Sequence, residues 1–230
     1  MTFRLSALAG LAAAGIVLAL SAAPGYAAEH PKAAKSTNAA PDIVASGKAM
    51  FEENCAPCHQ IDTKGKPGTA PSLTNKELLR FASDRFFAET IRDGRPDTPM
   101  PSFADVLQPA QIKAVIAYLR SYAKEPGRGE QIDAERPAKG DVLLGQERFQ
   151  QICSSCHGST GEGYEAGGSG TAIGRIGFLG KASDGFIRAT IREGRSNTPM
   201  HGFTGAAGLA NLSYEEIDGV IAYLRSTQRN

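Results

Sequence analysis

The four cysteines of the chain fall into two pairs of identical spacing, and this feature constrains the fold more than any other. In each pair two residues separate the cysteines, and a histidine follows the second cysteine directly. The two copies are Cys55, Cys58 and His59, and Cys153, Cys156 and His157. Because no cysteine is left for a disulfide, the chain is expected to fold around two similar local sites rather than around a disulfide framework.

The spacing has a direct chemical interpretation. Two thiols separated by two residues, with a histidine immediately after them, are typical of covalent attachment of a c-type haem. The thiols form thioether bonds to the two vinyl groups of one haem, and the imidazole then lies against the iron. Two copies therefore predict two covalently bound haem c groups.

Other uses of this spacing are a zinc site and a thiol redox pair, and the two pairs together would suffice for a four-cysteine zinc site. Three features favour haem over these alternatives. They are the histidine after each pair, the export signal described below, and a methionine that recurs downstream of each pair.

The duplication extends through most of the chain. Three groups of residues recur in the same order: Gly47 and Phe51 against Gly145 and Phe149, Thr90–Met100 against Thr190–Met200, and Ile116–Arg120 against Ile221–Arg225. A repeat of this length predicts two tandem domains, because the units of a solenoid are shorter.

The repeat and the composition between its copies define the expected domains. Residues 42–124 form the first module and residues 141–230 the second module. Residues 125–140 contain prolines, glycines, several charges and a single large apolar residue, Ile132, which is typical of a linker. A module of this size buries little surface of its own, so a buried haem would complete each core.

The N-terminal residues read as an export signal. Residues 1–27 contain one charge, Arg4, then an apolar run, then small residues, which is typical of a secretory signal peptide cleaved near Ala27. Residues 28–41 form a flexible leader. The apolar run is near the lower limit for spanning a bilayer, so an uncleaved membrane anchor is the alternative. Either case predicts a periplasmic location or one on the outer face of the membrane.

The haem irons of an electron carrier need a second axial ligand besides His59 and His157. The methionines beyond the signal segment are Met50, Met100 and Met200, and the other histidines are His30 and His201. Met100 and Met200 both follow a Thr-Pro pair at the same place in each repeat, and we interpret them as the distal ligands. Their alternative role is core packing, which we assign to Met50. His201 is either a surface residue or a competing ligand beside Met200.

These residues together resemble the class I c-type cytochromes from about Pro41 to Asn230. The resemblance implies an all-α module in which the first and last helices cross. The expected contacts are Gly47 and Phe51 with Tyr118 and Leu119, and Gly145 and Phe149 with Tyr223 and Leu224.

The resemblance also implies that a proline carbonyl accepts a hydrogen bond from the proximal imidazole. Pro71 fits that role in the first module. We match Thr69–Pro71 with Thr171–Ile173, where the proline is missing, and this leaves open whether His157 has such a bond. Because such partners tune the metal, the two reduction potentials are expected to differ. Arg95 and Arg195 are either partners of haem propionates or ordinary solvated arginines.

The prediction is an exported dihaem cytochrome that relays single electrons between redox proteins, either as a free carrier or as the cytochrome subunit of a dehydrogenase. Charge is nearly balanced and no basic run is interleaved with aromatic residues, so nucleic acid is not an expected partner. The alternative is a dihaem oxidoreductase that acts on peroxide or a small sulfur compound, which requires a vacant position on one iron.

Overall fold

A computed structural model describes residues 41–205, 208 and 210–228, all of which belong to one compact unit. The predicted signal peptide, the leader up to residue 40, and His30 lie outside the described residues. Within the described part, the regular elements are helices, and the only β-pairing consists of two isolated bridges. The predicted all-α fold is confirmed.

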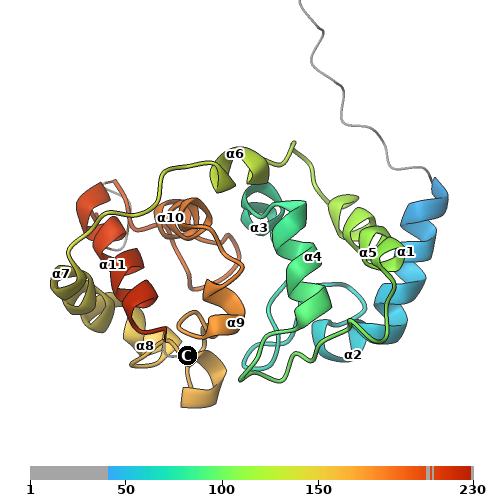
Figure 1. Cartoon of the computed structure of the whole chain (residues 1–230), viewed down its shortest axis with the longest axis horizontal. Coiled ribbons are helices and arrows are strands. Elements are labelled where there is room, and N and C mark those ends of the chain that lie inside the picture. The colour runs from blue at the N-terminus through green and yellow to red at the C-terminus, as the bar shows by residue number, and fades with distance from the viewer. Residues whose placement is uncertain (1–40, 206–207, 209, 229–230) are drawn as a thin grey trace, which may run out of the picture. The chain divides into compact units, whose positions relative to one another are not determined.

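The helices follow the same order in both modules (Figure 1). The first module contains α1 (Pro41–Asn54), α2 (Ala56–His59), α3 (Lys76–Phe81), α4 (Asp84–Asp93) and α5 (Pro109–Arg120). The second contains α7 (Val142–Arg148), a π-helical turn (Phe149–Cys153), α8 (Ser154–His157), a 3₁₀ turn (Gly163–Ala166), α9 (Ile176–Leu179), α10 (Asp184–Glu193) and α11 (Tyr214–Ser226). Between them, α6 (Gly129–Asp133) interrupts the predicted linker.

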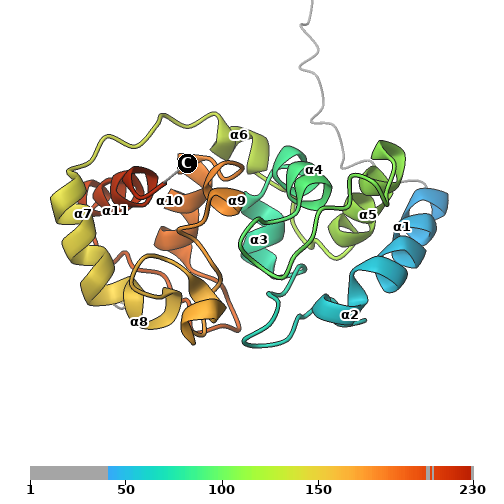
Figure 2. The same ribbon diagram turned by 60° about the horizontal axis from the view of Figure 1, so that its bottom comes forward.

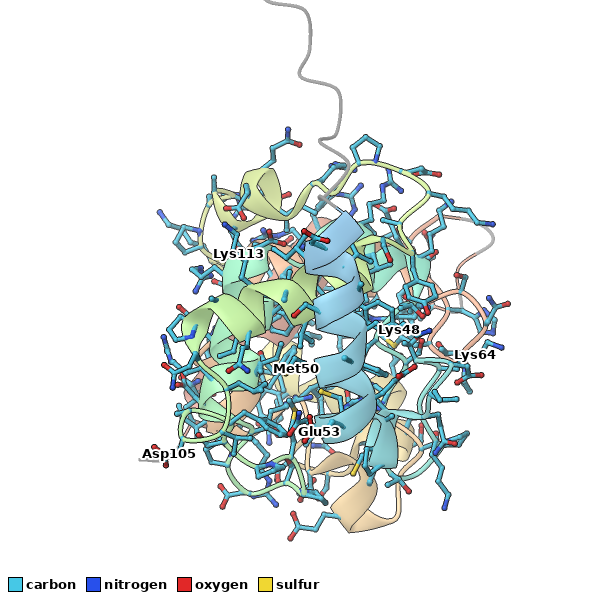
Figure 3. The ribbon with its side chains drawn as sticks, turned by 90° about the vertical axis from the view of Figure 1, so that its right-hand side faces the viewer. Lys48, Met50, Glu53, Lys64, Asp105 and Lys113 are labelled. Atoms are coloured by element: carbon cyan, nitrogen blue, oxygen red, sulfur yellow. The ribbon has the colours of Figure 1, made fainter. Side chains whose placement is uncertain are left out.

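The first and last helices of the first module cross at a glycine, as predicted (Figure 3). A Cβ atom on Gly47 would lie 1.9 Å from the carbonyl oxygen of Ala114 on α5, so only glycine fits this crossing. One turn further along α1, Phe51 is fully buried and its ring centroid lies 5.4 Å from that of Tyr118. Met50 packs partly buried against this core, and its sulfur accepts a hydrogen bond from Gln111 Nε2. The packing role of Met50 is therefore confirmed.

The second module repeats this crossing with α7 and α11, which lie side by side in both views (Figures 1 and 2). A Cβ atom on Gly145 would lie 1.9 Å from the carbonyl oxygen of Gly219. Phe149 is fully buried, with its ring 5.3 Å from that of Tyr223. Because the same close approach is built twice, each pair of crossing helices presents its cysteine motif at a corresponding place.

In each module, an arginine near the end of the last helix donates hydrogen bonds to backbone carbonyls in the middle of the module. Arg120 donates hydrogen bonds to the carbonyl oxygens of Leu79 and Ala82 at the end of α3. Arg225 donates to the corresponding carbonyls of Leu179 and Ala182. These carbonyls are not paired within their own short helices, so the arginines satisfy groups that a helix end leaves free.

The two modules contact each other through corresponding elements. Phe86 of α4 stacks on Phe186 of α10, with ring centroids 4.8 Å apart. Nearby, the backbone N–H and the hydroxyl of Ser196 both donate to Glu77, at 2.9 and 2.8 Å. Arg80 forms an ion pair with Glu193 at 3.2 Å.

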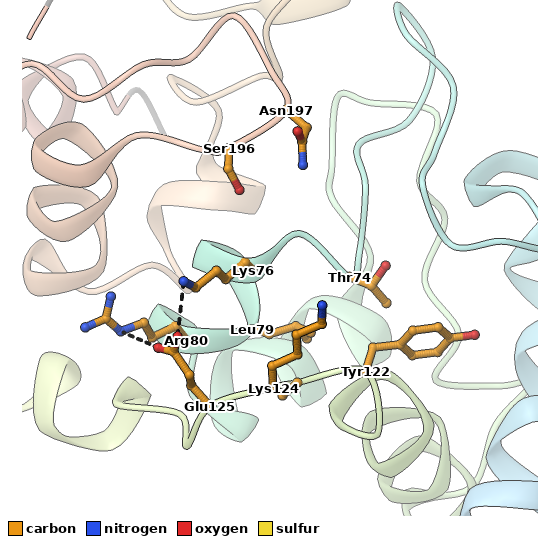
Figure 4. Close-up of a pocket in the computed structure, with 10 residues that line it drawn as sticks. Thr74, Lys76, Leu79, Arg80, Tyr122, Lys124, Glu125, Ser196 and Asn197 are labelled. Atoms are coloured by element: carbon orange, nitrogen blue, oxygen red, sulfur yellow. Dashed lines mark ion pairs between the residues drawn. The ribbon is translucent and has the colours of Figure 1, made fainter.

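A cavity of about 260 Å³ adjoins this contact (Figure 4). Its lining comes from both modules and consists of Thr74, Lys76, Leu79, Arg80, Tyr122, Ala123, Lys124, Glu125, Ser196 and Asn197. Glu125 pairs there with Lys76 at 3.1 Å and with Arg80 at 4.0 Å, so charges of both signs line the cavity.

The segment expected to be a plain linker is anchored to both modules. Ile132 of α6 is 1% exposed and belongs to the apolar core. Further on, Glu135 pairs with Arg188 at 2.9 Å, and Arg136 pairs with Asp218 at 2.7 Å. Across residues 41–205, 208 and 210–228, no helix combines the length and apolar character needed to cross a membrane.

Candidate haem sites

The first cysteine motif lies where α1 ends and α2 begins. The backbone N–H of Cys55 still donates to Phe51 at 2.8 Å, and the N–H of His59 donates to Cys55 at 2.9 Å. The motif is therefore wound into helical turns, in which side chains three residues apart lie on one face. This brings Cys55 and Cys58 to the same side of the turn, as a single planar group with two attachment points requires.

The imidazole of His59 is oriented by the backbone. Its Nδ1 is 2.9 Å from the carbonyl oxygen of Pro71, and the prediction for Pro71 is thereby confirmed. Burial lowers the pKa of His59; the hydrogen bond to Pro71 opposes this shift and the charge of Arg95 adds to it. A neutral ring that donates through Nδ1 leaves Nε2 free as a metal ligand.

The second site has the same hydrogen bond without the proline. Nδ1 of His157 is 2.8 Å from the carbonyl oxygen of Thr171. Thr171, rather than Ile173, therefore takes the place of Pro71, so the match of Thr69–Pro71 with Thr171–Ile173 was wrong by two positions. The bond survives because a backbone carbonyl makes it, and any residue supplies one. Burial lowers the pKa of His157 as well.

The glycine-rich loop of the second module packs tightly around its histidine. A Cβ atom on Gly170 would lie 2.6 Å from the His157 ring. Gly158, Gly161, Gly163 and Gly167 all have positive φ, a backbone region that glycine enters without strain. The abundance of glycine thus allows the loop to lie directly on the imidazole.

The two methionine loops share two hydrogen bonds. In the first module, the N–H of Arg95 donates to the Met100 carbonyl at 3.0 Å, and the Thr98 hydroxyl donates to the Arg95 carbonyl at 2.7 Å. In the second module, the N–H of Arg195 donates to the Met200 carbonyl at 2.6 Å, and the Thr198 hydroxyl donates to the Arg195 carbonyl at 2.7 Å. Both Met100 and Met200 are partly buried.

Arg95, at the start of the Met100 loop, lies near His59. Arg95, which is hydrogen-bonded to Met100, is close enough to influence the pKa of His59. His201 beside Met200 is exposed, which agrees with a surface residue.

Buried polar atoms without a partner occur in the repeated segment that ends at each methionine, Thr90–Met100 and Thr190–Met200. In the described part of the chain, Nη1 of Arg195 and the hydroxyl of Thr90 are buried without a hydrogen-bond partner, as is Nε of Arg175 outside this segment. Burial also lowers the pKa of Arg195 to about 10, so the side chain stays charged at neutral pH. Because buried polar groups are normally paired, these atoms fit an additional acidic group such as a haem propionate.

The zinc and dithiol alternatives fit less well. In the residues that the structure covers, no three His, Cys, Asp or Glu side chains gather as metal ligands. Burial, with a smaller effect of the neighbouring cysteine, raises the pKa of Cys55 to about 11 and that of Cys153 to about 12. Burial therefore disfavours the thiolate, which thiol redox chemistry requires, at Cys55 and Cys153.

Several important residues carry no signal in the sequence. Asp133 lies in the segment predicted as a linker, and Glu77 and Ser196 are ordinary polar residues. Nη2 of Arg95 also donates to the Ala172 carbonyl of the second module at 2.7 Å. These two residues lie far apart in the chain, so no local pattern indicates their contact. Only the repeated Ser83 and Ser183, each followed by aspartate, could have been recognised beforehand, as helix N-caps.

Comparison with known proteins gives a family match for each module. Residues 42–119 match the model of cytochrome c oxidase, cbb3-type, subunit III, and residues 142–228 match that of cytochrome c. The chain is 31% identical over 204 residues to the cbb3-type cytochrome c oxidase subunit CcoP of Rubrivivax gelatinosus, a match that covers 89% of this chain and 61% of that protein. It thus spans about three fifths of that relative.

Two further similarities are more distant. The cytochrome bc1 complex cytochrome c subunit of Mycobacterium bovis is 27% identical over 219 residues, which is 91% of this chain and 74% of that protein. A solved chain of the Kuenenia stuttgartiensis reducing HAO-like protein complex Kustc0457/Kustc0458 is 22% identical with a TM-score of 0.48, over 80% of this chain and 96% of that one.

Cytochrome c domains bind haem covalently and transfer electrons rather than catalyse reactions themselves. Both cysteine pairs fit this attachment. With a cytochrome family match on each module, the chain belongs to the c-type cytochromes, as a tandem of two cytochrome c domains.

Proposed function

We propose that each module binds one haem c and that the chain relays single electrons between redox proteins. The first haem would be attached to Cys55 and Cys58, with His59 and Met100 as axial ligands. The second would have Cys153, Cys156, His157 and Met200 in the same roles. The domains would comprise residues 42–124 and 141–230, joined by 125–140.

The main support for this proposal is that the same arrangement of a histidine and a methionine loop occurs in both modules. In both modules a buried or half-buried imidazole has Nδ1 within hydrogen-bond distance of a backbone carbonyl, and a Thr-Pro-Met loop with the same threonine hydrogen bond belongs to the same repeat. Packing needs alone do not dictate this coincidence twice. When bound, haem supplies the one-electron chemistry, and the protein residues orient the imidazole and exclude water.

The proposed setting is the periplasm or the outer face of the membrane, with a respiratory redox complex as partner. The named relatives of the cbb3 and bc1 complexes support this partner class. A free carrier or a dehydrogenase subunit would use the same two sites, and residues 1–27 would act as the export signal or as an anchor.

The test uses the exported holoprotein. We expect the pyridine haemochrome assay to give two haems per chain, and the reduced protein not to bind carbon monoxide because both iron positions are filled. Rapid turnover of peroxide or a small sulfur compound, together with carbon monoxide binding, would identify an enzyme and overturn the proposal. A single haem per chain would overturn the two-site assignment.

A further inference from the structure

The two carbonyls that orient the proximal histidines are held in different ways. In the first module the acceptor belongs to Pro71, whose ring restricts its own φ angle. The preceding residue, Ala70, forms two backbone hydrogen bonds with Lys66, both 2.9 Å long. The acceptor of His59 is therefore fixed by residues of its own module.

The second module lacks the proline and its loop is rich in glycine. Hydrogen bonds hold the segment instead: Gly170 N–H donates to Cys156 at 2.8 Å, and Ile173 N–H donates to Gly161 at 2.9 Å. Ala172 lies between Gly170 and Ile173, and its carbonyl accepts a hydrogen bond from the other module. Arg95 Nη2 donates to the Ala172 carbonyl at 2.7 Å, one residue after the Thr171 acceptor of His157.

Arg95 is held firmly at both ends. Its backbone N–H is bound to Met100, and its guanidinium lies over the ring of Phe178, 5.2 Å from the centroid. Burial lowers the pKa of Arg95 to about 10, which still leaves it charged at neutral pH. Its hydrogen bond to Ala172 is therefore charge-assisted and enclosed, a combination that makes such bonds strong.

The corresponding arginine of the second module does not return this contact. Nη2 of Arg195 lies 3.4 Å from the Thr190 hydroxyl of its own module, and its Nη1 has no partner among the described residues. The support thus runs in one direction, from the module with the proline to the module without it.

We propose that Arg95 is a positioning residue for the second site: the first module holds the backbone that orients His157. Arg95 thereby replaces the restriction that Pro71 supplies in the first module. This inference rests on the proposed function only in that His157 ligates a haem; the hydrogen-bond support itself is tested without that assumption.

The first experiment measures amide hydrogen exchange in the intact protein with the substitution Arg95→Leu. We expect exchange at Gly170 and Ile173 to accelerate by about tenfold, as loss of a charge-assisted bond predicts for local opening. Arg80→Leu is the matched control, since Arg80 also joins the modules through Glu193 but does not contact this segment. Unchanged exchange in Arg95→Leu, or an equal acceleration in Arg80→Leu, would overturn the proposal.

The second experiment asks whether the support reaches the histidine. Electron paramagnetic resonance of the oxidised protein reports imidazole orientation at each iron, and the second-site signal is the one altered by Met200→Ala. We expect Arg95→Leu to shift that signal. Adding Thr171→Pro, which installs the proline of the first module, should restore it.

The two readouts separate the two claims. A signal that Arg95→Leu shifts only at the first site would contradict the cross-module role of Arg95. Accelerated exchange in a protein that holds no haem at His157 would leave the support intact and overturn the haem assignment instead.

Discussion

Ser83 and Ser183, the N-caps of α4 and α10, donate their hydroxyls to the two oxygens of one carboxylate. Asp133 of α6 accepts from Ser83 through Oδ2 and from Ser183 through Oδ1, both at 2.6 Å. Each serine oxygen also accepts from the backbone of its own helix. The segment between the modules therefore joins the starts of two corresponding helices through a single residue.

Replacing Asp133 with alanine should weaken the connection between the modules. The change leaves both serine hydroxyls without their acceptor and removes the 3.1 Å ion pair with Arg85, so we expect a loss of about 2 kcal/mol in the free energy of unfolding. Chemical unfolding followed by circular dichroism should become less cooperative. Glu130→Gln, an exposed change on the same helix, serves as the control, and equal effects of both changes would contradict the role of Asp133.

The buried pair of Arg188 and Asp218 should make the second module sensitive to acid. Their side chains are 5% and 3% exposed and 2.8 Å apart. Burial alone raises the pKa of Asp218, but hydrogen bonds from Arg188 and Arg136 outweigh it and lower this pKa below its ordinary value. The contribution of Asp218 to the free energy of unfolding is thus fully present at a pH above its unfolded pKa of about 3.9. It is lost as the pH falls through the lower pKa of the native state.

Asp218→Asn should therefore cost about 3 kcal/mol at pH 7 and much less in strong acid. Guanidinium unfolding at a series of pH values measures both effects. Asp105→Asn, at an exposed acid of the first module, should have little effect at any pH. A cost for Asp218→Asn that does not change between pH 7 and pH 2 would contradict this assignment.

The crossing of α1 and α5 should not tolerate a side chain at Gly47. Since a Cβ atom there would overlap the Ala114 carbonyl, Gly47→Ala should destabilise the first module by about 3 kcal/mol or more. Gly127→Ala is the control, because its nearest neighbour would be 3.4 Å away. Thermal unfolding of both variants measures the difference, and a Gly47→Ala protein as stable as the control would exclude the close crossing.

The methionine variants should separate the two haems. Met100→Ala and Met200→Ala should each remove about half of the weak red charge-transfer absorption of methionine-bound ferric haem and lower one of the two reduction potentials. Optical spectra and a redox titration of the oxidised protein provide the measurement, with Met50→Ala as the control. Full retention of the red band in either variant would remove that methionine from the ligand set.

The chemistry of the chain can be predicted from its sequence because it depends on residues that are close together in the chain. The Cys-Cys-His pattern, the Thr-Pro-Met loops and the glycine-aromatic pairs at the helix crossings are local patterns, and duplication showed each of them twice. The crossings at Gly47 and Gly145 and the hydrogen bond from His59 to Pro71 follow this local logic, and the structure confirms them.

Tertiary structure decided the contacts between residues far apart in the chain. The acceptor of His157 is Thr171 because the glycine-rich loop folds onto the imidazole, which changes the register that the repeat alone indicated. Asp133 meets two serines, and Arg95 reaches Ala172, only because the two modules pack together. Such contacts depend on the path of the whole backbone. The two Cys-Cys-His attachment motifs, in contrast, depend on only a few consecutive residues.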